Sequence, residues 1–136
     1  MLKAVLDTNV IVAGFINTKG IPGEIVRKAI LGQFKPVVDN RIIDEYFAVL
    51  NRPKFHFNKT EIEIFRHNLY MNAEFIKDCK PIKNPKLPAD DIVFLEVAIN
   101  SKAEYLVTGN IYHFNFSEFE LCGILSPAEF IKVISR

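Results

Sequence analysis

The sequence contains little cysteine, almost no net charge and no long hydrophobic run. Its two cysteines, Cys79 and Cys122, fit neither a CxxC motif nor a Cys/His spacing, so we expect a reduced interior and no zinc site. No apolar segment approaches the roughly 20 residues that cross a bilayer. The N-terminus also lacks the basic, apolar and cleavage regions of a signal peptide. We therefore expect a soluble cytoplasmic protein that has no membrane partner.

The formal net charge of +1 means that bulk charge would not attract nucleic acid, and any such binding would need a local basic patch. What the chain does have is the composition of a globular protein, since 49% of its 136 residues are hydrophobic and 24% are charged. A chain of this length buries about two-thirds of its unfolded surface and needs no disulfide or metal to fold. No repeat, low-complexity tract or linker divides it, so we expect one domain over residues 1–136.

Strand and helix signals alternate along the chain. Short apolar runs predict strands at residues 2–6, 34–39, 103–109 and 119–125. Amphipathic or capped segments predict helices at residues 22–32, 40–51, 60–76, 90–101 and 127 onward. This alternation predicts an α/β fold with a mostly parallel central sheet of four to five strands and helices on both faces.

Three helix starts carry capping signals. Asp39 precedes the segment at 40–51 and can cap it. Thr60 with Glu63, and Ser126 with Glu129, have the spacing of a capping box. We therefore expect the later helices to begin at these residues.

Polar residues interrupt the apolar pattern where two strands end. Asp7 follows the first strand directly, and Thr108 ends the strand at 103–109. In an open parallel sheet the ligand crevice lies outside the carboxyl ends of the strands. We therefore expect Asp7 and Thr108 to lie at the same edge.

Two further acids lie in segments that otherwise look buried. Glu45 has apolar neighbours around most of its helix, and Asp91 lies in the first turn of a helix with a wide apolar face. Carboxylates gathered at a low-dielectric edge repel one another unless a cation neutralises them. Oxygen ligands suit Mg²⁺ or Mn²⁺, which can activate water for in-line attack on a phosphodiester.

Each acid also has a simpler explanation. Asp7 could cap a helix that starts near Val10, the helix dipole alone favours Asp91, and a helical glutamate such as Glu45 is most often a solvated surface residue. Glu96 is open to two interpretations, as a supporting residue or as a helix-surface charge. Only the joint order of the acids favours a site.

Other residues are weaker candidates. Four cationic residues are candidates for phosphate contact, although surface lysines are usually only solubilising. None of the three histidines has metal-ligand spacing, although His113 follows the Thr108 strand closely enough to touch a substrate. Three nearby phenylalanines are expected in the core or on a partner surface rather than against bases. The four cationic residues are Arg41, Arg52, Lys83 and Lys86. The histidines are His56, His67 and His113, and the phenylalanines are Phe114, Phe116 and Phe119.

Five ordered segments together resemble a PIN domain, and within that family the toxins of the VapC-like ribonuclease group. The resemblance covers essentially the whole chain, and although DTN alone would be weak, five segments in order are specific. The segments are DTNVIV (7–12), RIIDEYFAVLNRPKF (41–55), DDIVFLEVA (90–98), EYLVTGN (104–110) and ILSPAEFI (124–131).

The resemblance implies a metal-dependent endoribonuclease, the toxin of a type II toxin-antitoxin pair. Asp7, Glu45 and Asp91 would be its catalytic residues and its ligands for Mg²⁺ or Mn²⁺, with Asp90 as a rival of Asp91. Further implied partners are RNA, an antitoxin protein and a second copy of the chain.

Supporting roles follow from the same resemblance. Thr8 or Asn9 would hold the first loop, and Thr108 would bond a carboxylate or a metal-bound water. Many relatives have an aspartate where this chain has Asn110, and an amide brings no charge. This difference leaves open whether one metal or two would bind.

Three other functions compete with the nuclease. A haloacid-dehalogenase-type phosphatase would need a second aspartate at position 9, where Asn9 stands, and its Ser/Thr motif should precede the acidic pair that Thr108 follows. A receiver-type signalling module would need a lysine after the strand at 103–109. A PIN fold that has lost activity and serves as a binding protein is kept open by Asn110.

Overall fold

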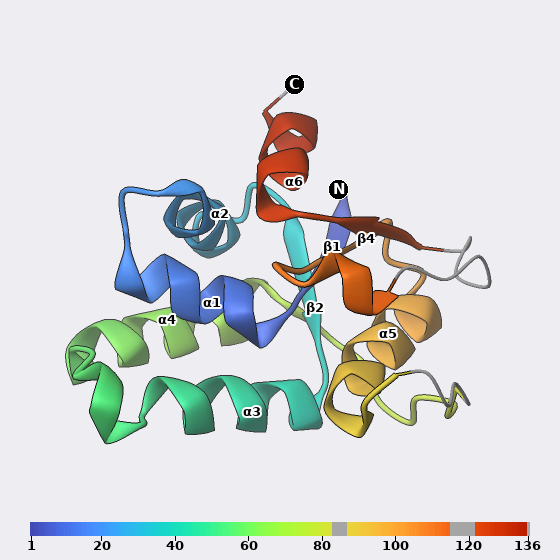
Figure 1. Ribbon diagram of the computed structural model, residues 1–136, viewed down its shortest axis with the longest axis horizontal. Helices are drawn as coiled ribbons and strands as arrows, with labels where there is room; N and C mark the ends of the chain where they lie inside the picture. The colour runs from blue at the N-terminus through green and yellow to red at the C-terminus, as the bar shows by residue number, and fades with distance from the viewer. Residues whose placement is uncertain (83–86, 115–121, 136) are drawn as a thin grey trace.

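A five-stranded parallel sheet forms the centre of the molecule (Figure 1). The computed structural model describes residues 1–82, 87–114 and 122–135. The strand order is β3-β2-β1-β4-β5, and every neighbouring pair is parallel. The strands are β1 (Lys3–Leu6), β2 (Lys35–Val38), β3 (Glu74–Phe75), β4 (Tyr105–Val107) and β5 (Gly123–Leu125). The predicted α/β class with a parallel sheet is therefore confirmed.

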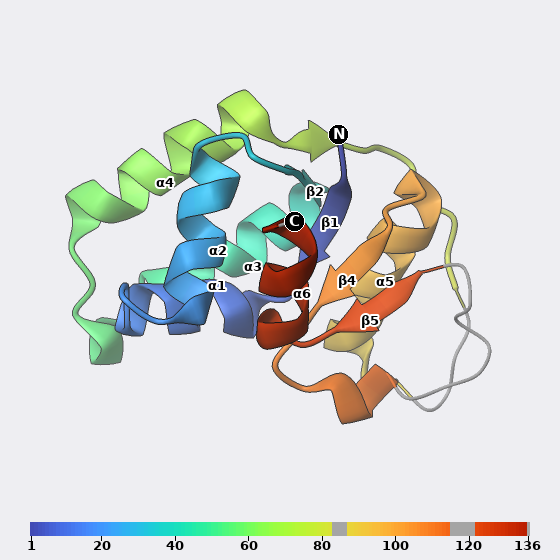
Figure 2. The same cartoon turned by 90° about the horizontal axis from the view of Figure 1, so that it is seen from above.

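Helices cover both faces of the sheet. In Figure 1, α2 and α6 lie above it and α3 and α5 below it, while α1 and α4 lie at the left between these layers. Figure 2 shows the same arrangement from above, with α6 in front of the strands and α5 behind β4. The helices are α1 (Thr8–Ile16), α2 (Ile21–Ile30), α3 (Asn40–Leu50), α4 (Lys59–Asn72), α5 (Ala89–Ser101) and α6 (Pro127–Ile134), with single 3₁₀ turns η1 (Pro53–Phe55) and η2 (Ile111–Phe114).

The register of β1 and β4 brings their carboxyl ends to one level. Leu6 lies opposite Val107, and the next amide, that of Asp7, donates to the Val107 carbonyl at 2.9 Å. On the other side of β4, the Thr108 amide donates to the carbonyl of Leu125 at 3.0 Å. Asp7 and Thr108 therefore leave the sheet side by side, as the strand pattern predicts.

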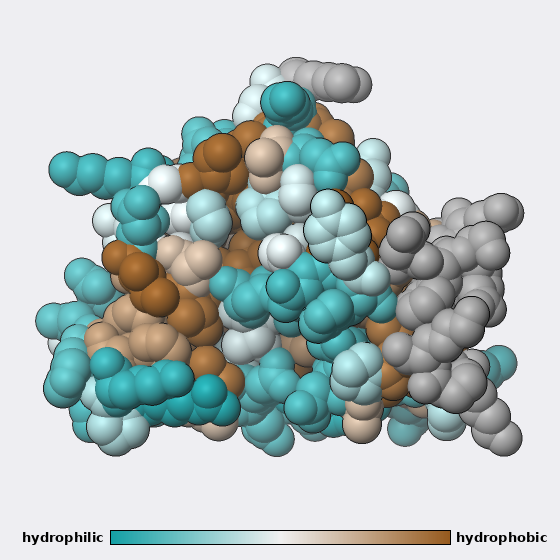
Figure 3. Space-filling model, in the orientation of Figure 1, coloured by the Kyte–Doolittle hydropathy of each residue, from teal (hydrophilic) through white to brown (hydrophobic). Residues whose placement is uncertain are grey.

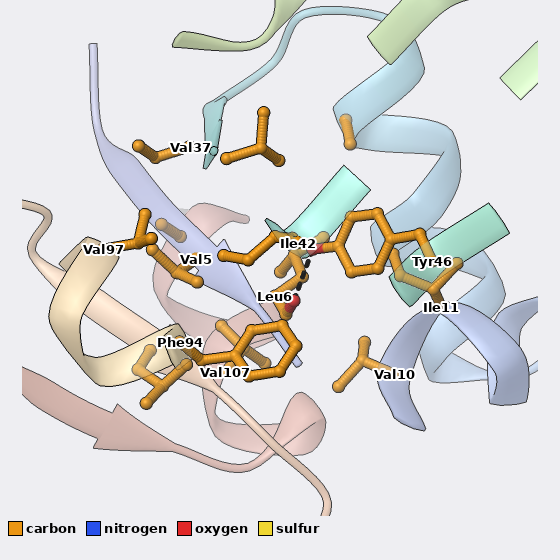
Figure 4. Packing of buried hydrophobic residues seen from close by; sticks show 14 of the residues in the cluster. Val5, Leu6, Val10, Ile11, Val37, Ile42, Tyr46, Phe94, Val97 and Val107 are labelled. Atoms are coloured by element: carbon orange, nitrogen blue, oxygen red, sulfur yellow. Dashed lines mark hydrogen bonds between the residues drawn. The ribbon is translucent and has the colours of Figure 1, made fainter. Parts of the chain in front are cut away.

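The core surrounds β1 and fixes α3 against its end. Val5 and Leu6 are fully buried, with Phe94 of α5 and Val107 of β4 beside them (Figure 4). The Tyr46 hydroxyl of α3 reaches across this core and donates to the Leu6 carbonyl. Since Glu45 directly precedes Tyr46 on the helix, this bond also sets the position of Glu45 relative to the strand end.

Two details of the predicted elements are wrong. The helix at 60–76 does not begin with the Thr60 box, because Asn58 lies at the cap position and accepts from the Glu61 amide at 3.0 Å. It also ends at Asn72, since the chain then turns into β3 and the Ile76 amide donates to the Val38 carbonyl at 3.0 Å.

The other caps agree with the sequence. Asp39 accepts from the Ile42 amide, and Ser126 and Glu129 form the reciprocal capping box of α6. Of the strand predicted at 119–125, residues 119–121 lie outside the described part of the chain. Within that part, no helix has the length and hydrophobicity needed to cross a membrane.

Candidate functional site

Asp7 occupies the helix-cap position of α1 without capping it. The residue has the extended backbone of an N-cap, yet its side chain accepts no capping hydrogen bond. Its Oδ2 instead accepts from the Thr108 hydroxyl at 2.7 Å and from the Asn9 side-chain amide at 3.2 Å. Only 6% of its surface is exposed. The side-chain partners of this buried carboxylate are therefore Thr108 and Asn9, and the ordinary capping bond is absent.

A loop after β4 braces this carboxylate. Thr108 is fully buried, and its hydroxyl also accepts from the backbone N–H of Asn110 at 3.0 Å. The backbone N–H of Gly109 donates to the Asn9 side-chain oxygen at 3.1 Å. The loops after β1 and β4 are thus tied together through Asn9 and Thr108. Asn110 contributes its backbone to this link, and its side chain is exposed.

Glu45 is joined to the same edge through Thr8. The Thr8 hydroxyl donates to Glu45 Oε2, so the second residue of the DTN motif binds the acid on α3. Thr8 is buried and Glu45 is half-buried, whereas the neighbouring acid Asp44 is exposed. On this helix Tyr46 faces the core and Glu45 faces the strand end, whereas Asp44 is exposed to solvent. Of the two acids, only Glu45 therefore contacts this edge of the sheet.

Asp91 enters the edge from α5. Its side chain is 20% exposed, and its Oδ2 lies 3.2 Å from His113 Nδ1. Asp90, its rival from the sequence, is exposed and has no comparable contact among the described residues. Asp91 thus remains the better candidate for the third acid.

The three acids are close enough to influence one another. The pKa of Asp7 is raised, mainly by burial, and the charges of Asp91 and Glu45 raise it further, while the Thr108 hydrogen bond acts against these effects. The pKa of the Tyr46 hydroxyl is also raised well above its usual range, by burial first and then by the Asp7 and Glu45 charges.

The donor set is chemically suited to a hard divalent cation. It supplies carboxylate oxygens from three elements and hydroxyl oxygens beside them, with no thiol at the edge, and this matches Mg²⁺ or Mn²⁺ rather than zinc. Within residues 1–82, 87–114 and 122–135, no three acidic, histidine or cysteine side chains stand close enough together to form a metal-binding group. Each carboxylate is turned to its own partner: Asp7 to Thr108, Glu45 to Thr8 and Asp91 to His113.

A second acidic group lies at the end of β2, and it is neutralised. Arg41 Nη2 contacts Asp39 Oδ2 at 2.8 Å, and Arg41 Nη1 contacts Glu96 Oε1 at 2.8 Å. Glu96 is buried, and its other oxygen accepts from the Ile82 amide at 2.9 Å. Glu96 therefore ties α5 to α3 and to the loop before α5, and it is not a helix-surface charge. Arg41, a candidate for phosphate contact, is engaged in this ion pair.

The remaining candidates do not join the site. His56 and His67 are exposed on η1's end and on α4, and Phe114 is buried in the core as expected. Arg52 is exposed after α3. Lys83, Lys86, Phe116 and Phe119 lie outside the described residues.

Sequence reasoning missed three pairings that build the edge: Thr8 with Glu45, Tyr46 with Leu6, and His113 with Asp91. Only the last had a sequence signal, since His113 follows the Thr108 strand exit closely. In the other two pairs the residues lie far apart in the sequence, by 37 positions for Thr8 and Glu45 and by 40 for Tyr46 and Leu6. No local pattern links such pairs.

Comparison with known proteins agrees with this architecture. A chain from the crystal structure of VapBC2 from Rickettsia felis bound to a DNA fragment from their promoter is similar, with a TM-score of 0.56 at 16% sequence identity, over 92% of this chain and 98% of that one. No curated protein matches the sequence. The family model described as PIN domain matches residues 3–112. The predicted resemblance is therefore confirmed, and the chain belongs to the PIN domain family.

Proposed function

We propose that this protein is a Mg²⁺- or Mn²⁺-dependent endoribonuclease that hydrolyses RNA phosphodiester bonds. PIN domains are generally nucleases, which supports a hydrolase. The observation that carries the proposal is the environment of Asp7. This carboxylate lies at the end of a central strand, its pKa is raised by burial first and then by two like charges, and its side-chain hydrogen-bond partners are neutral. Such an arrangement is unfavourable unless a cation compensates the charges, and perturbed carboxylates of this kind cluster at functional sites.

In this proposal Asp7, Glu45 and Asp91 supply the oxygen ligands. A bound divalent ion would supply an activated water and would stabilise the leaving oxygen of the phosphodiester. Thr108 holds the Asp7 carboxylate by a hydroxyl hydrogen bond, and Thr8 does the same for Glu45. These contacts orient the two carboxylates toward the edge, since neither acid is free to rotate without losing a bond.

The chain offers matched controls for a test, because two of the proposed ligands each have an acidic neighbour that is exposed. Glu45→Gln should be compared with Asp44→Asn, and Asp91→Asn with Asp90→Asn. Purified protein is incubated with structured and with single-stranded RNA, with EDTA and then with added Mg²⁺ or Mn²⁺. We expect cleavage only with the metal. Loss of a ligand should reduce the rate about 100-fold or more, as the removal of several kcal/mol of stabilisation predicts.

The controls should cleave within about twofold of the parent protein, since exposed charges away from the site contribute little. Cleavage that persists in EDTA, or equal losses in both members of a pair, contradicts the assigned site. No cleavage of any RNA under any metal condition would instead favour a catalytically impaired PIN protein that acts by binding. The family assignment disfavours the phosphatase and the receiver module.

We further propose that a cognate antitoxin protein binds over the acidic edge. A hollow between α1 and α3 is lined by Thr8, Asn9 and Glu45 at the edge and continues over the apolar residues Val12, Ala13, Ile16, Val49 and Phe55. In Figure 3 hydrophobic residues gather over α1, between α2 and α3. Ile16 is 64% exposed there. A partner that covers this hollow would bury apolar surface and block the acids at once.

Co-expression with a small gene encoded beside this one tests the partner. Ile16→Glu should release the partner and restore cleavage in its presence, because the partner would then have to bury a charge. Leu31→Glu is the control, since Leu31 is 68% exposed but lies outside the hollow. Equal effects of the two changes, or no effect of Ile16→Glu on inhibition, would exclude this docking face. Light scattering of the isolated 15.6 kDa chain tests the expected homodimer.

A further inference from the structure

One exposed aromatic residue stands beside the acidic edge. Tyr112 lies in η2 and is 84% exposed, which is unusual for a large ring. Its neighbour His113 contacts Asp91 at 3.2 Å, so the ring is one residue from a proposed ligand contact. In Figure 2 the turn that carries it, drawn in orange after β4, protrudes from the body below β4 and β5.

The turn is held firmly on both sides of Tyr112. Before it, the Asn110 amide donates to the buried Thr108 hydroxyl. After it, Phe114 is buried with 2% exposure, and the His113 amide donates to the Asn110 carbonyl at 3.0 Å. The exposure of Tyr112 is therefore set by the turn geometry, since these backbone hydrogen bonds and the buried Phe114 anchor the chain on both sides of it.

A shallow hollow adjoins the ring. Its lining consists of Ile111, Tyr112, Phe114 and Ile124, all of them apolar or aromatic. The flat face of an aromatic ring fits such a wall, and a nucleobase presents such a face. Base stacking on an aromatic side chain does not depend on base identity, because every base offers a π-face.

We propose that Tyr112 is a stacking platform for an unpaired RNA base next to the phosphate that the acidic edge cleaves. The inference rests on the proposed ribonuclease function for the nature of its substrate. A base held in this hollow would fix the strand relative to Asp91, because η2 is bonded to the same loop that braces Asp7. Unstacked bases of single strands and loops are the usual targets of such contacts in RNA recognition.

Kinetics give the first test. Tyr112→Ala should raise KM for unstructured RNA about 5- to 100-fold, which corresponds to the loss of one stacked base. The turnover number should change far less, because the acids are untouched. Tyr112→Phe should stay within about twofold, since the π-face remains. A change in thermal unfolding would reveal a structural role, and the phenylalanine variant separates that role from stacking.

Fluorescence gives a test that needs no catalysis. The chain contains no tryptophan, so Tyr112→Trp in an Asp7→Asn background introduces one reporter. An unstructured RNA should quench its emission, and an abasic sugar-phosphate strand should not. Tyr70→Trp is the control, because Tyr70 is 53% exposed on α4, stacks on Phe75 and does not line the hollow beside Tyr112.

The outcomes separate this inference from the proposed function. If the parent protein cleaves RNA with metal but Tyr112→Ala matches Tyr112→Phe in KM, the stacking role is wrong and the nuclease stands. If the reporter at 112 is quenched by RNA while no cleavage occurs, the nuclease fails and the stacking surface stands. Loss of a protein partner from Tyr112→Ala without any change in RNA binding would also overturn the inference.

Discussion

Two aspartates occupy the same place in the fold and do different things. Asp7 and Asp39 each follow a central strand, precede a helix and are almost fully buried, with 6% and 7% exposure. Asp39 caps α3 at 3.0 Å and pairs with Arg41. Asp7 makes no cap bond, and its side-chain partners are the neutral Thr108 and Asn9.

The difference lies in charge balance. At the end of β2, the Arg41 guanidinium lies between the carboxylates of Asp39 and Glu96, and both pairs lie within 2.8 Å. At the end of β1, no lysine or arginine forms a salt bridge with Asp7, Glu45 or Asp91 among the described residues. A strand–Asp–helix pattern is therefore not enough to identify a site. The absence of a compensating cation is what distinguishes Asp7, the proposed ligand, from Asp39, the helix cap.

The largest expected effect separates the two aspartates by activity. Asp7→Asn should reduce metal-dependent RNA cleavage about 100-fold or more, because it removes a ligand charge. Asp39→Asn should leave the rate within about threefold, since its carboxylate serves the fold. Initial rates at 25 °C on one RNA substrate, with folding checked by circular dichroism, measure both. Similar losses in the two variants would erase the distinction.

The second expected effect concerns stability. Arg41→Met leaves Glu96 buried without its partner, and breaking such a pair can cost several kcal/mol. Since the Arg41 side chain is 46% exposed, we expect a smaller loss of about 2 kcal/mol in the free energy of unfolding. Urea denaturation measures it. Arg52→Met is the control, because Arg52 is exposed and should matter by less than about 0.5 kcal/mol.

A smaller effect divides the two contributions of Asp39. Asp39→Asn removes the charge that faces Arg41 but keeps an oxygen for the Ile42 amide, whereas Asp39→Ala removes both. We expect the alanine variant to be about 1 kcal/mol less stable than the asparagine variant, which is the usual worth of an N-cap. Matching urea midpoints for the two variants would mean that the cap contributes nothing.

Much of the fold could be predicted from local patterns. Short apolar runs alternating with amphipathic segments identified four strands and five of the six helices in the described residues, because each pattern spans enough residues to be distinctive. The helix α1 entered only as an alternative explanation of Asp7. The strand β3 has two residues, Glu74 and Phe75, and offers no such pattern. The cap of α4 was misplaced because Asn58 and Thr60 both satisfy the capping preference. In the structure the helix begins after Asn58, which is therefore the N-cap.

The candidate site could be predicted as a set of residues but not as a geometry. Asp7, Glu45 and Asp91 stood out because acids in apolar segments are unusual. The strand ends placed Thr108 beside Asp7, but the partners of Glu45 and Asp91 were not visible, since these contacts join distant parts of the chain. The contact of Asp91 with His113 spans 22 residues, and that of Asp7 with Thr108 spans 101. Such pairings depend on strand order and register, which follow from the whole sheet.

The smallest expected effect again contrasts the two aspartates, now in thermal stability without metal. Burial raises the pKa of Asp7 above its ordinary value, so the ionised form is less favourable in the folded protein than in the unfolded chain. Asp7→Asn should therefore raise Tm at neutral pH in the presence of EDTA. Asp39→Asn should lower it, because that change removes an ion pair.

The pH dependence fixes the cause of this gain. The cost of the Asp7 charge is present above its raised pKa and disappears as the pH falls through that pKa, because the native carboxyl is then protonated. The Tm advantage of Asp7→Asn should therefore shrink toward acid pH. A constant advantage would indicate a packing effect instead. Asp44→Asn, a change at an exposed acid, should show little advantage at either pH. A gain confined to Asp7 and to neutral pH would show that the fold tolerates an unfavourable charge at this one strand end, as a ligand position requires and a helix cap does not.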